Sequence, residues 1–164
     1  MQDVVIIDPW HDPTRADYYT HIGNWCKNNT DIERIIIASY EDPRVDFTLY
    51  SILHEDPRTI IDENFDANDL NDTVWLLGQS WQACVHARPL GIPYILRAEK
   101  NIFTKVGFLK KQTPDGGIID VDEDMFLNDW YVWSQDGEVW QCIADEKNIR
   151  DAISHITAKE NNNG

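Results

Sequence analysis

Hydrophobic residues in the first hundred positions gather in short continuous runs that are separated by longer stretches of mixed polarity. Each run is rich in β-branched residues and ends in polar residues; the runs lie at 4–8, 34–40, 58–62, 74–78 and 93–98. Such runs are typical of strands that are buried on both faces, and the stretches between them are long enough for helices. The pattern therefore predicts a parallel sheet with helices on both faces.

Helix signals lie between the predicted strands. Asp12-Pro13 is typical of a helix start, in which aspartate caps the first turn and proline takes the first helical position. Apolar residues at helical spacing follow at Tyr18, Ile22, Trp25 and Cys26. Asp42-Pro43 predicts a second helix, with an apolar stripe at Val45, Leu49, Ile52 and Leu53. A third, short helix is predicted over 80–88, before Pro89.

The pattern changes after residue 100. Two turn sequences, 114–117 and 136–137, contain Asp-Gly and are flanked by apolar segments, which is typical of β-hairpins. The second turn pairs Trp133 with Trp140. An apolar stripe predicts a final helix from about Asp145. We therefore predict one α/β domain over 1–164: a three-layer, mostly parallel core over 1–100, extended over 101–164 by antiparallel hairpins and a C-terminal helix.

Composition favours a folded domain and excludes some partners. The chain has 164 residues, 42% of them hydrophobic, which is enough to bury a core despite a formal net charge of −15. With 29 acidic against 14 basic residues, it lacks the general basic surface that nucleic-acid binding needs. The three cysteines are widely spaced, and the apolar run 4–7 is too short for a signal peptide or a membrane span. We therefore expect a cytoplasmic protein without direct nucleic-acid or membrane contact.

Polar residues follow the predicted strands, at the sheet edge where α/β proteins bind ligands. Asp8 directly follows four apolar residues, where a carboxylate is costly to bury without a role. Cys84 lies in the predicted 80–88 helix; near the helix start, amide donors would make it a thiolate nucleophile, whereas the alternative is a small buried cysteine. Further ligand-binding candidates at this edge are Trp10, His11, Gln79, Ser80, Trp81 and Lys100.

Two segments resemble the isochorismatase-like cysteine hydrolases, a family that includes nicotinamidases. The segment 6–12, IIDPWHD, is similar to the family's V-I-D-x-Q-x-D strand end, with Trp10 where glutamine is usual. Gly78 through Cys84-Val85 is similar to its G-x-x-x-x-x-C-V nucleophile segment. Over roughly residues 4–98, the resemblance implies the family's α/β fold, with Asp8 as the catalytic acid and base and Cys84 as the nucleophile that attacks a carbonyl.

The family's third catalytic residue is a lysine, and this chain departs from the family there. The stretch 61–67 resembles the family segment, with Asp62 where the lysine belongs. A carboxylate disfavours a nearby thiolate and the negative charge that develops on a substrate oxygen. Lys100, at the end of the fifth predicted strand, is the alternative source of positive charge. The resemblance therefore implies a small-molecule-binding protein or a weakened amidase, without a metal or another cofactor.

Two other functions stay open at this point. A non-catalytic acidic protein could use its charge to bind a basic protein partner or to imitate nucleic acid. The clustered carboxylates over 62–72 and 120–124 suit Mg²⁺ or Ca²⁺, and a Mg²⁺-dependent phosphoesterase could use Asp8, Asp12 and Asp62. Solvated acidic loops are the alternative for these stretches. Apolar residues on both faces of the second hairpin are compatible with a homodimer.

Overall fold

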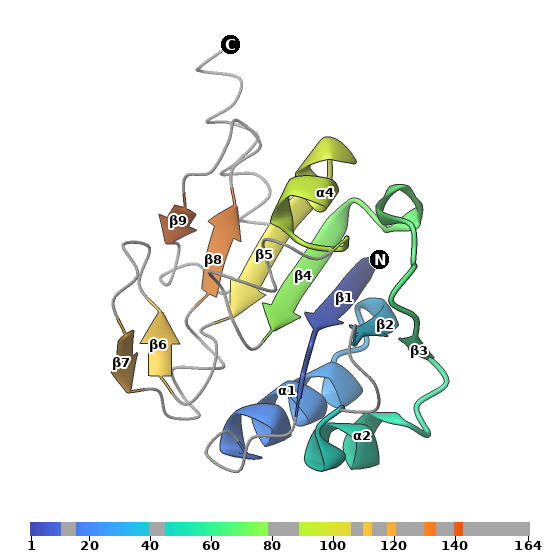
Figure 1. The fold of residues 1–164 in the computed structure, drawn as a ribbon, viewed down its shortest axis with the longest axis vertical. Coiled ribbons are helices and arrows are strands. Elements are labelled where there is room, and N and C mark those ends of the chain that lie inside the picture. The colour runs from blue at the N-terminus through green and yellow to red at the C-terminus, as the bar shows by residue number, and fades with distance from the viewer. Residues whose placement is uncertain are drawn as a thin grey trace.

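The computed structural model describes residues 1–10, 16–39, 45–78, 89–105, 110–112, 118–120, 130–133 and 140–142 (Figure 1). Within these residues, the main sheet has seven strands in the order β3-β2-β1-β4-β5-β8-β9. They are β1 (Gln2–Ile7), β2 (Ile32–Ala38), β3 (Thr59–Ile61), β4 (Thr73–Gly78), β5 (Asn101–Lys105), β8 (Trp130–Trp133) and β9 (Trp140–Cys142). The strands from β3 to β5 all run parallel, which confirms the predicted parallel sheet.

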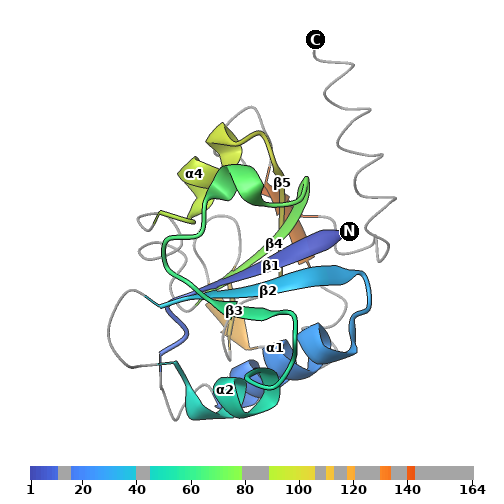
Figure 2. The same cartoon turned by 90° about the vertical axis from the view of Figure 1, so that its right-hand side faces the viewer.

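Helices lie on both faces of this sheet (Figure 2). α1 (Ala16–Asn28) and α2 (Phe47–Leu53) lie together on one face. α4 (Ile92–Arg97) lies on the other face, next to the 3-10 helix η2 (Ala67–Asp69). The predicted α/β architecture is therefore confirmed for the described part of the chain up to residue 105.

The core lies where β1 and β4 meet α1. Every residue of β1 from Asp3 onward is buried, and so is every residue of β4. The predicted stripe of α1 is confirmed, with these side chains buried: Tyr18, Ile22 and Cys26. Next to them, the rings of Trp25 and Trp75 meet edge to face with their centroids 5.1 Å apart, so α1 packs directly against β4.

Gly23 allows α1 and α2 to approach closely. A Cβ atom at this position would lie 2.8 Å from Ile52 Cδ1, closer than two carbon atoms can approach without a shift. On α2, Leu49 and Leu53 are buried and Ile52 packs against the core, which confirms these three positions of the predicted stripe. Val45, the fourth, precedes the helix and forms an isolated β-bridge with Trp10. The spacing of the two helices therefore depends on a missing side chain at Gly23.

One predicted strand is wrong. The run 93–98 belongs to helix α4, because Gly91 starts the helix and Pro93 occupies its first turn, where a backbone donor is not required. Ile92 and Ile95 are buried at helical spacing. The fifth parallel strand is β5 instead, which begins at Asn101, in the region where the sequence predicted the change to hairpins.

The predicted cap of α2 is also wrong. Asp46 precedes the helix, and its Oδ1 accepts hydrogen bonds from Thr48 N at 2.9 Å and Leu49 N at 3.1 Å. An aspartate that bonds the amides two and three residues later is an N-cap. Asp42 lies four positions too early for this role.

Antiparallel pairs follow β5 in the chain. β8 pairs with β5 and with β9, and Trp133 lies opposite Trp140. β6 (Lys110–Gln112) pairs with β7 (Ile118–Asp120) in a separate sheet. The helices predicted over 80–88 and from Asp145, and the predicted cap Asp12, lie outside the described residues.

A buried carboxylate joins three segments at the amino edge of the sheet. Asp3 is fully buried, and Arg34 donates to it from Nε at 3.0 Å and from Nη2 at 2.8 Å. Asn71 donates to the same carboxylate from its backbone N at 2.7 Å and its Nδ2 at 3.1 Å. Since a buried charge is stable only when it is paired and hydrogen-bonded, this contact ties β1, β2 and the start of β4 together.

A second arginine holds the carboxyl end of α1. Arg58 donates to Cys26 O at 3.0 Å and to Asn29 O at 2.8 Å, near the end of the helix. These carbonyl groups also accept from Asn29 N at 3.3 Å and from Ile32 N at 3.4 Å, so Arg58 adds a second donor to each. The same guanidinium bonds both carboxylate oxygens of Asp56, at 3.0 and 2.8 Å. These side-chain hydrogen bonds lower the pKa of Asp56 below its ordinary value.

We predict that Asp56→Asn destabilises the protein by about 1–2 kcal/mol at pH 7, because Arg58 loses a charged partner. The pKa of Asp56 is lower in the folded chain, so its contribution is complete above the unfolded pKa of about 4 and is lost as the pH falls through the folded value. Urea unfolding should therefore give a smaller difference between wild type and variant at pH 2.5 than at pH 7. Glu63→Gln, which removes the same charge at an exposed position, is the control. An equal loss of stability from Asp56→Asn at both pH values would contradict the lowered pKa of Asp56.

Candidate functional site

The strand order reverses between β1 and β4. From β1 the chain adds β2 and then β3 on one side, and it returns to place β4 and β5 on the other side. In open α/β sheets, ligands bind beyond the carboxyl ends of the strands at this reversal. The residues directly beyond these two strands are Asp8 and Gln79, of which Asp8 lies within the described residues.

Asp8 combines complete burial with a backbone conformation that favours glycine. Its N–H donates to Ala38 O at 2.9 Å, which extends the β1–β2 pairing by one residue. Its side chain is 0% exposed, and its φ is 47°, in the left-handed region. Aspartate tolerates this region better than most residues do, at a cost of about 1 kcal/mol. Residues with such backbone angles are concentrated at functional sites.

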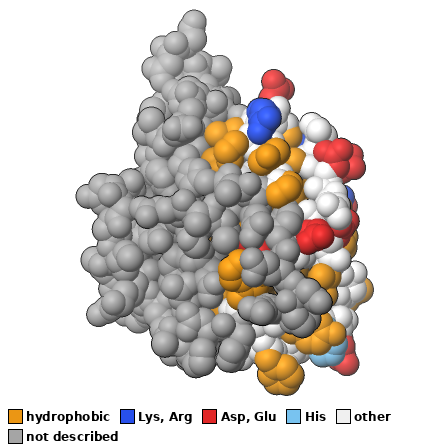
Figure 3. Space-filling view, viewed as in Figure 1, with side chains coloured by type: hydrophobic (Ala, Val, Ile, Leu, Met, Phe, Trp, Pro, Cys, Tyr) orange, Lys and Arg blue, Asp and Glu red, His pale blue; other side chains and the backbone are white. Residues whose placement is uncertain are grey.

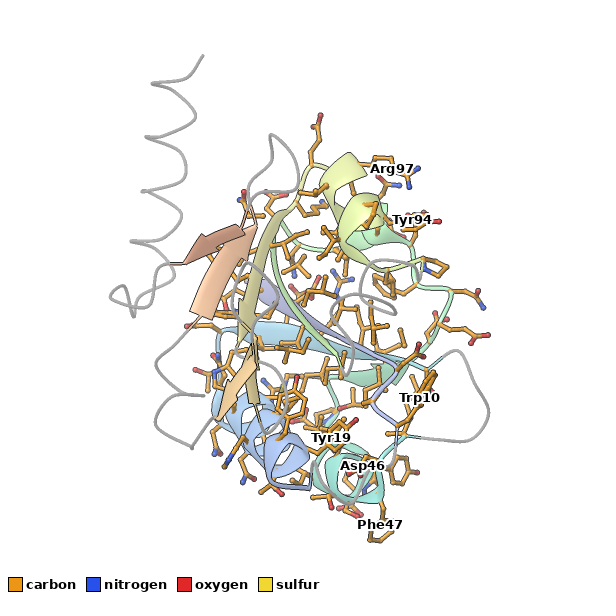
Figure 4. The ribbon with its side chains drawn as sticks, turned by 60° about the vertical axis from the view of Figure 1, so that its left-hand side comes forward. Trp10, Tyr19, Asp46, Phe47, Tyr94 and Arg97 are labelled. Atoms are coloured by element: carbon orange, nitrogen blue, oxygen red, sulfur yellow. The ribbon has the colours of Figure 1, made fainter. Side chains whose placement is uncertain are left out.

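Contacts with two helices hold the segment from Asp8 to Trp10 in place. Trp10 N donates to Asp8 O at 2.8 Å, which makes a tight turn around Pro9. Asp46 N, at the start of α2, donates to Pro9 O at 2.7 Å, and the Tyr19 hydroxyl of α1 donates to Trp10 O at 2.8 Å. Figure 4 shows Trp10, Tyr19 and Asp46 in the same region below the sheet. Since each carbonyl oxygen of this turn has a donor, Asp8 is presented by a fixed backbone.

The end of β4 is held by the neighbouring tyrosine of the same helix. The Tyr18 hydroxyl donates to Gly78 O at 3.0 Å in a buried contact. The rings of Tyr18 and Tyr19 lie 5.6 Å apart between centroids. α1 therefore fixes both strand ends that flank the reversal of strand order. Sequence reasoning placed Tyr18 in the core stripe and missed the roles of both hydroxyl groups; two adjacent tyrosines at the start of an amphipathic helix were the available signal.

Asp62 lies at the same edge of the sheet, but its carboxylate is used locally. Its N–H donates to Ile37 O at 3.1 Å, so it follows β3 directly. Its Oδ1 accepts from Asn64 N at 2.8 Å, which stabilises the turn after the strand. Strand β2 separates β3 from β1, so Asp62 and Asp8 follow strands that are not neighbours.

Lys100 lies at the opposite edge, and its predicted position is wrong. It precedes β5 and therefore sits at the amino ends of the parallel strands. Its Nζ is 3.6 Å from Asp72 Oδ1, and Asp72 directly precedes β4. The error follows from the assignment of 93–98 as a strand, because a strand there would have ended next to Lys100.

The other predicted site residues lie outside the described residues: His11, Gln79, Ser80, Trp81 and Cys84. Of the predicted set, the structure therefore places Asp8 and Trp10 together, Asp62 at the same edge, and Lys100 at the other edge. Of the three cysteines, Cys26 is a buried free thiol, and burial raises its pKa.

The acidic stretch 62–72 forms turns. Asp66 caps η2 through a bond from Asn68 N to its Oδ1 at 2.9 Å, much as Asp62 does in the preceding turn. Within the described residues, no three His, Cys, Asp or Glu side chains gather closely enough to hold a metal ion. Figure 3 shows acidic side chains spread singly over the side of the molecule that carries β3 and α4.

Comparison with protein-family models, curated proteins and solved structures gives no match to this chain. Among the described helices, none is long and apolar enough to cross a membrane.

We predict that glycine is better tolerated than alanine at position 8. Both substitutions remove the carboxylate, so their difference isolates the backbone; at a φ of 47°, a Cβ should make Asp8→Ala about 1 kcal/mol less stable than Asp8→Gly. Urea unfolding of both variants measures the difference. The same pair at the exposed Asp72 should show the reverse order, since alanine restricts the unfolded chain more than glycine does. The left-handed assignment would be refuted by a preference for alanine at both positions.

Proposed function

We propose that this chain binds a small molecule at the carboxyl edge of the sheet, between the ends of β1 and β4, with Asp8 as the polar anchor. The observation that carries the proposal is a buried carboxylate in a left-handed conformation at the reversal of strand order. Burial of a carboxylate is energetically unfavourable, so a buried acid often has a function. At the carboxyl edge of an α/β sheet, that function is commonly ligand binding.

The ligand we propose carries an amine or another hydrogen-bond donor. Asp8 supplies an acceptor, and Asp62 adds a second carboxylate at the same edge. The net charge of −15 repels anionic ligands. Trp10 belongs to the turn that presents Asp8, and the sequence adds Trp81, so we assign the flat part of the ligand to aromatic side chains.

Binding without hydrolysis is the form of the proposal that the residues support best. The resemblance to the isochorismatase-like hydrolases matches Asp8 and Cys84 to the family's acid and nucleophile. The family's lysine is replaced by Asp62, and Lys100 is held beside Asp72 at the opposite edge. With Asp62 in place of the family's lysine, the matched positions supply no positive charge to stabilise the thiolate or a developing oxyanion, so we assign this chain a binding role.

Three ligands with the same ring test the proposed chemistry. Benzylamine and benzamide should bind at millimolar concentration, observed as shifted amide signals in NMR spectra, whereas benzoate should not. Asp8→Asn should weaken benzylamine binding by about tenfold or more, because the charged acceptor is lost, and should weaken benzamide less, because an acceptor oxygen stays. Asp72→Asn, at the opposite edge, is the matched control. Equal binding of benzoate, or unchanged benzylamine binding by Asp8→Asn, would overturn the proposal.

Alkylation by iodoacetamide tests whether hydrolase chemistry survives. We expect Cys84 to react with a midpoint near the ordinary thiol pKa of about 8.5, and Cys26 to stay unreactive in the folded protein because burial raises its pKa. Asp62→Lys, which restores the family's charge, should lower the midpoint of Cys84. Mass spectrometry of labelled peptides gives both rates. Rapid labelling of wild-type Cys84 at pH 6.5 would show an activated nucleophile and contradict the loss of chemistry.

A further inference from the structure

A groove of about 340 Å³ lies between η2 and α4, on the face of the sheet opposite α1. Its polar lining consists of Asp66 and Asn68 from the η2 side and Tyr94 and Arg97 from α4. Phe65 and Pro89 are among its apolar lining residues. Ligand sites of proteins begin at about this volume, so the groove can hold a small metabolite.

Arg97 is held in orientation by its neighbours on α4, and it has no acidic partner among the described residues. Its guanidinium lies over the Tyr94 ring, with Cζ 4.6 Å from the ring centroid, and Figure 4 shows the two side chains next to each other on α4. Its Nε donates to Pro93 O at 3.3 Å. Within the described part of the chain, no carboxylate lies within ion-pair distance of Arg97, so the terminal Nη1 and Nη2 donors are available to a ligand.

The other two described arginines behave differently. Arg34 makes two bonds to the carboxylate of Asp3, and Arg58 makes two bonds to that of Asp56. Although the chain has about two acidic residues for every basic one, Arg97 differs from these two described arginines in having no carboxylate among its partners within the described residues. The planar fork of a guanidinium matches the two oxygens of a carboxylate.

Asp66 supplies the opposite charge within the same groove. Its Oδ1 accepts from the backbone N and the Nδ2 of Asn68, at 2.9 and 3.0 Å. Its Oδ2 makes no hydrogen bond to the described residues, and Asp66 does not form an ion pair with Arg97. The groove therefore presents a positive and a negative group from two different elements, together with apolar surface.

The geometry points to a second binding site, for a free α-amino acid with an apolar side chain. The ligand carboxylate bonds Arg97, the ligand ammonium bonds Asp66, and the side chain covers Phe65 and Pro89. A simple anion fits less well, because Asp66 and the net charge of −15 repel it. A simple cation is repelled by Arg97. A zwitterion satisfies both groups, so its two charges are recognised together.

L-Phenylalanine and two blocked derivatives test this site by isothermal titration calorimetry with the full chain. L-Phenylalanine should bind saturably, whereas N-acetyl-L-phenylalanine, which lacks the ammonium, and L-phenylalanine amide, which lacks the carboxylate, should each bind about tenfold more weakly or worse. Arg97→Gln should reproduce the loss with the intact amino acid. Asp66→Asn keeps the bonds from Asn68 to Oδ1 and should weaken L-phenylalanine by a similar factor.

Control variants separate this site from the carboxyl edge and from damage to the fold. Lys100→Gln lies just beyond α4 and outside both proposed sites, and it should bind L-phenylalanine as wild type does. Arg97 and Asp66 are exposed, so their variants should keep the wild-type melting temperature. Absence of saturable binding, equal binding of the blocked derivatives, or wild-type affinity of Arg97→Gln would each overturn the inference. A loss caused by Asp8→Asn would assign the amino acid to the carboxyl edge instead.

Discussion

The rest of the structure depends on the complete burial of β1. The strand is paired with β2 on one side and β4 on the other, and its residues from Asp3 to Ile7 are buried. Every polar group in such a strand must find its partner inside the protein, because water cannot serve. The four apolar residues of the strand meet this requirement through the sheet itself. The aspartates at its two ends, Asp3 and Asp8, are held in different ways.

At the amino end, Asp3 is neutralised by Arg34 and by two bonds from Asn71. This carboxylate is fully used by the fold, and it joins segments that are 31 and 68 residues away in the chain. At the carboxyl end, Asp8 is placed by its backbone, through Ala38 and the turn to Trp10. The position of Asp8 is therefore set by its left-handed backbone and by the contacts that α1 and α2 make with the turn that follows it, and the proposed function assigns its carboxylate to a ligand.

The strands that form apolar runs could be predicted from the sequence. The start of a helix or the identity of its cap could not, because these depend on individual hydrogen bonds and backbone angles. The first four strands were predictable because each contains a short run of apolar residues, and β1, β2 and β4 are largely buried. The run 93–98 has the same apolar character, but Gly91 and Pro93 start a helix there. A strand over this run would have placed Lys100 at the carboxyl edge of the sheet, whereas the helix leaves it at the amino edge, beside Asp72. For α2, both Asp42 and Asp46 precede the helix in the sequence, and only the hydrogen bonds to the Asp46 side chain identify it as the N-cap. Asp8 was predictable as a candidate, since an acid that directly follows an apolar strand stands out in the sequence, and the structure shows that it is buried. The roles of the Tyr18 and Tyr19 hydroxyl groups were not predictable, because a hydrogen-bond partner distant in sequence leaves no pattern in the chain.

The two tyrosines have a mechanical consequence. Tyr18 holds the end of β4 and Tyr19 holds the turn after β1, and both belong to the first two turns of one helix. The helix is also anchored at its other end by Arg58 and packed against α2 through Gly23. A displacement of α1 would then shift both strand ends at once, because their carbonyl groups are hydrogen-bonded to adjacent tyrosines of the same helix.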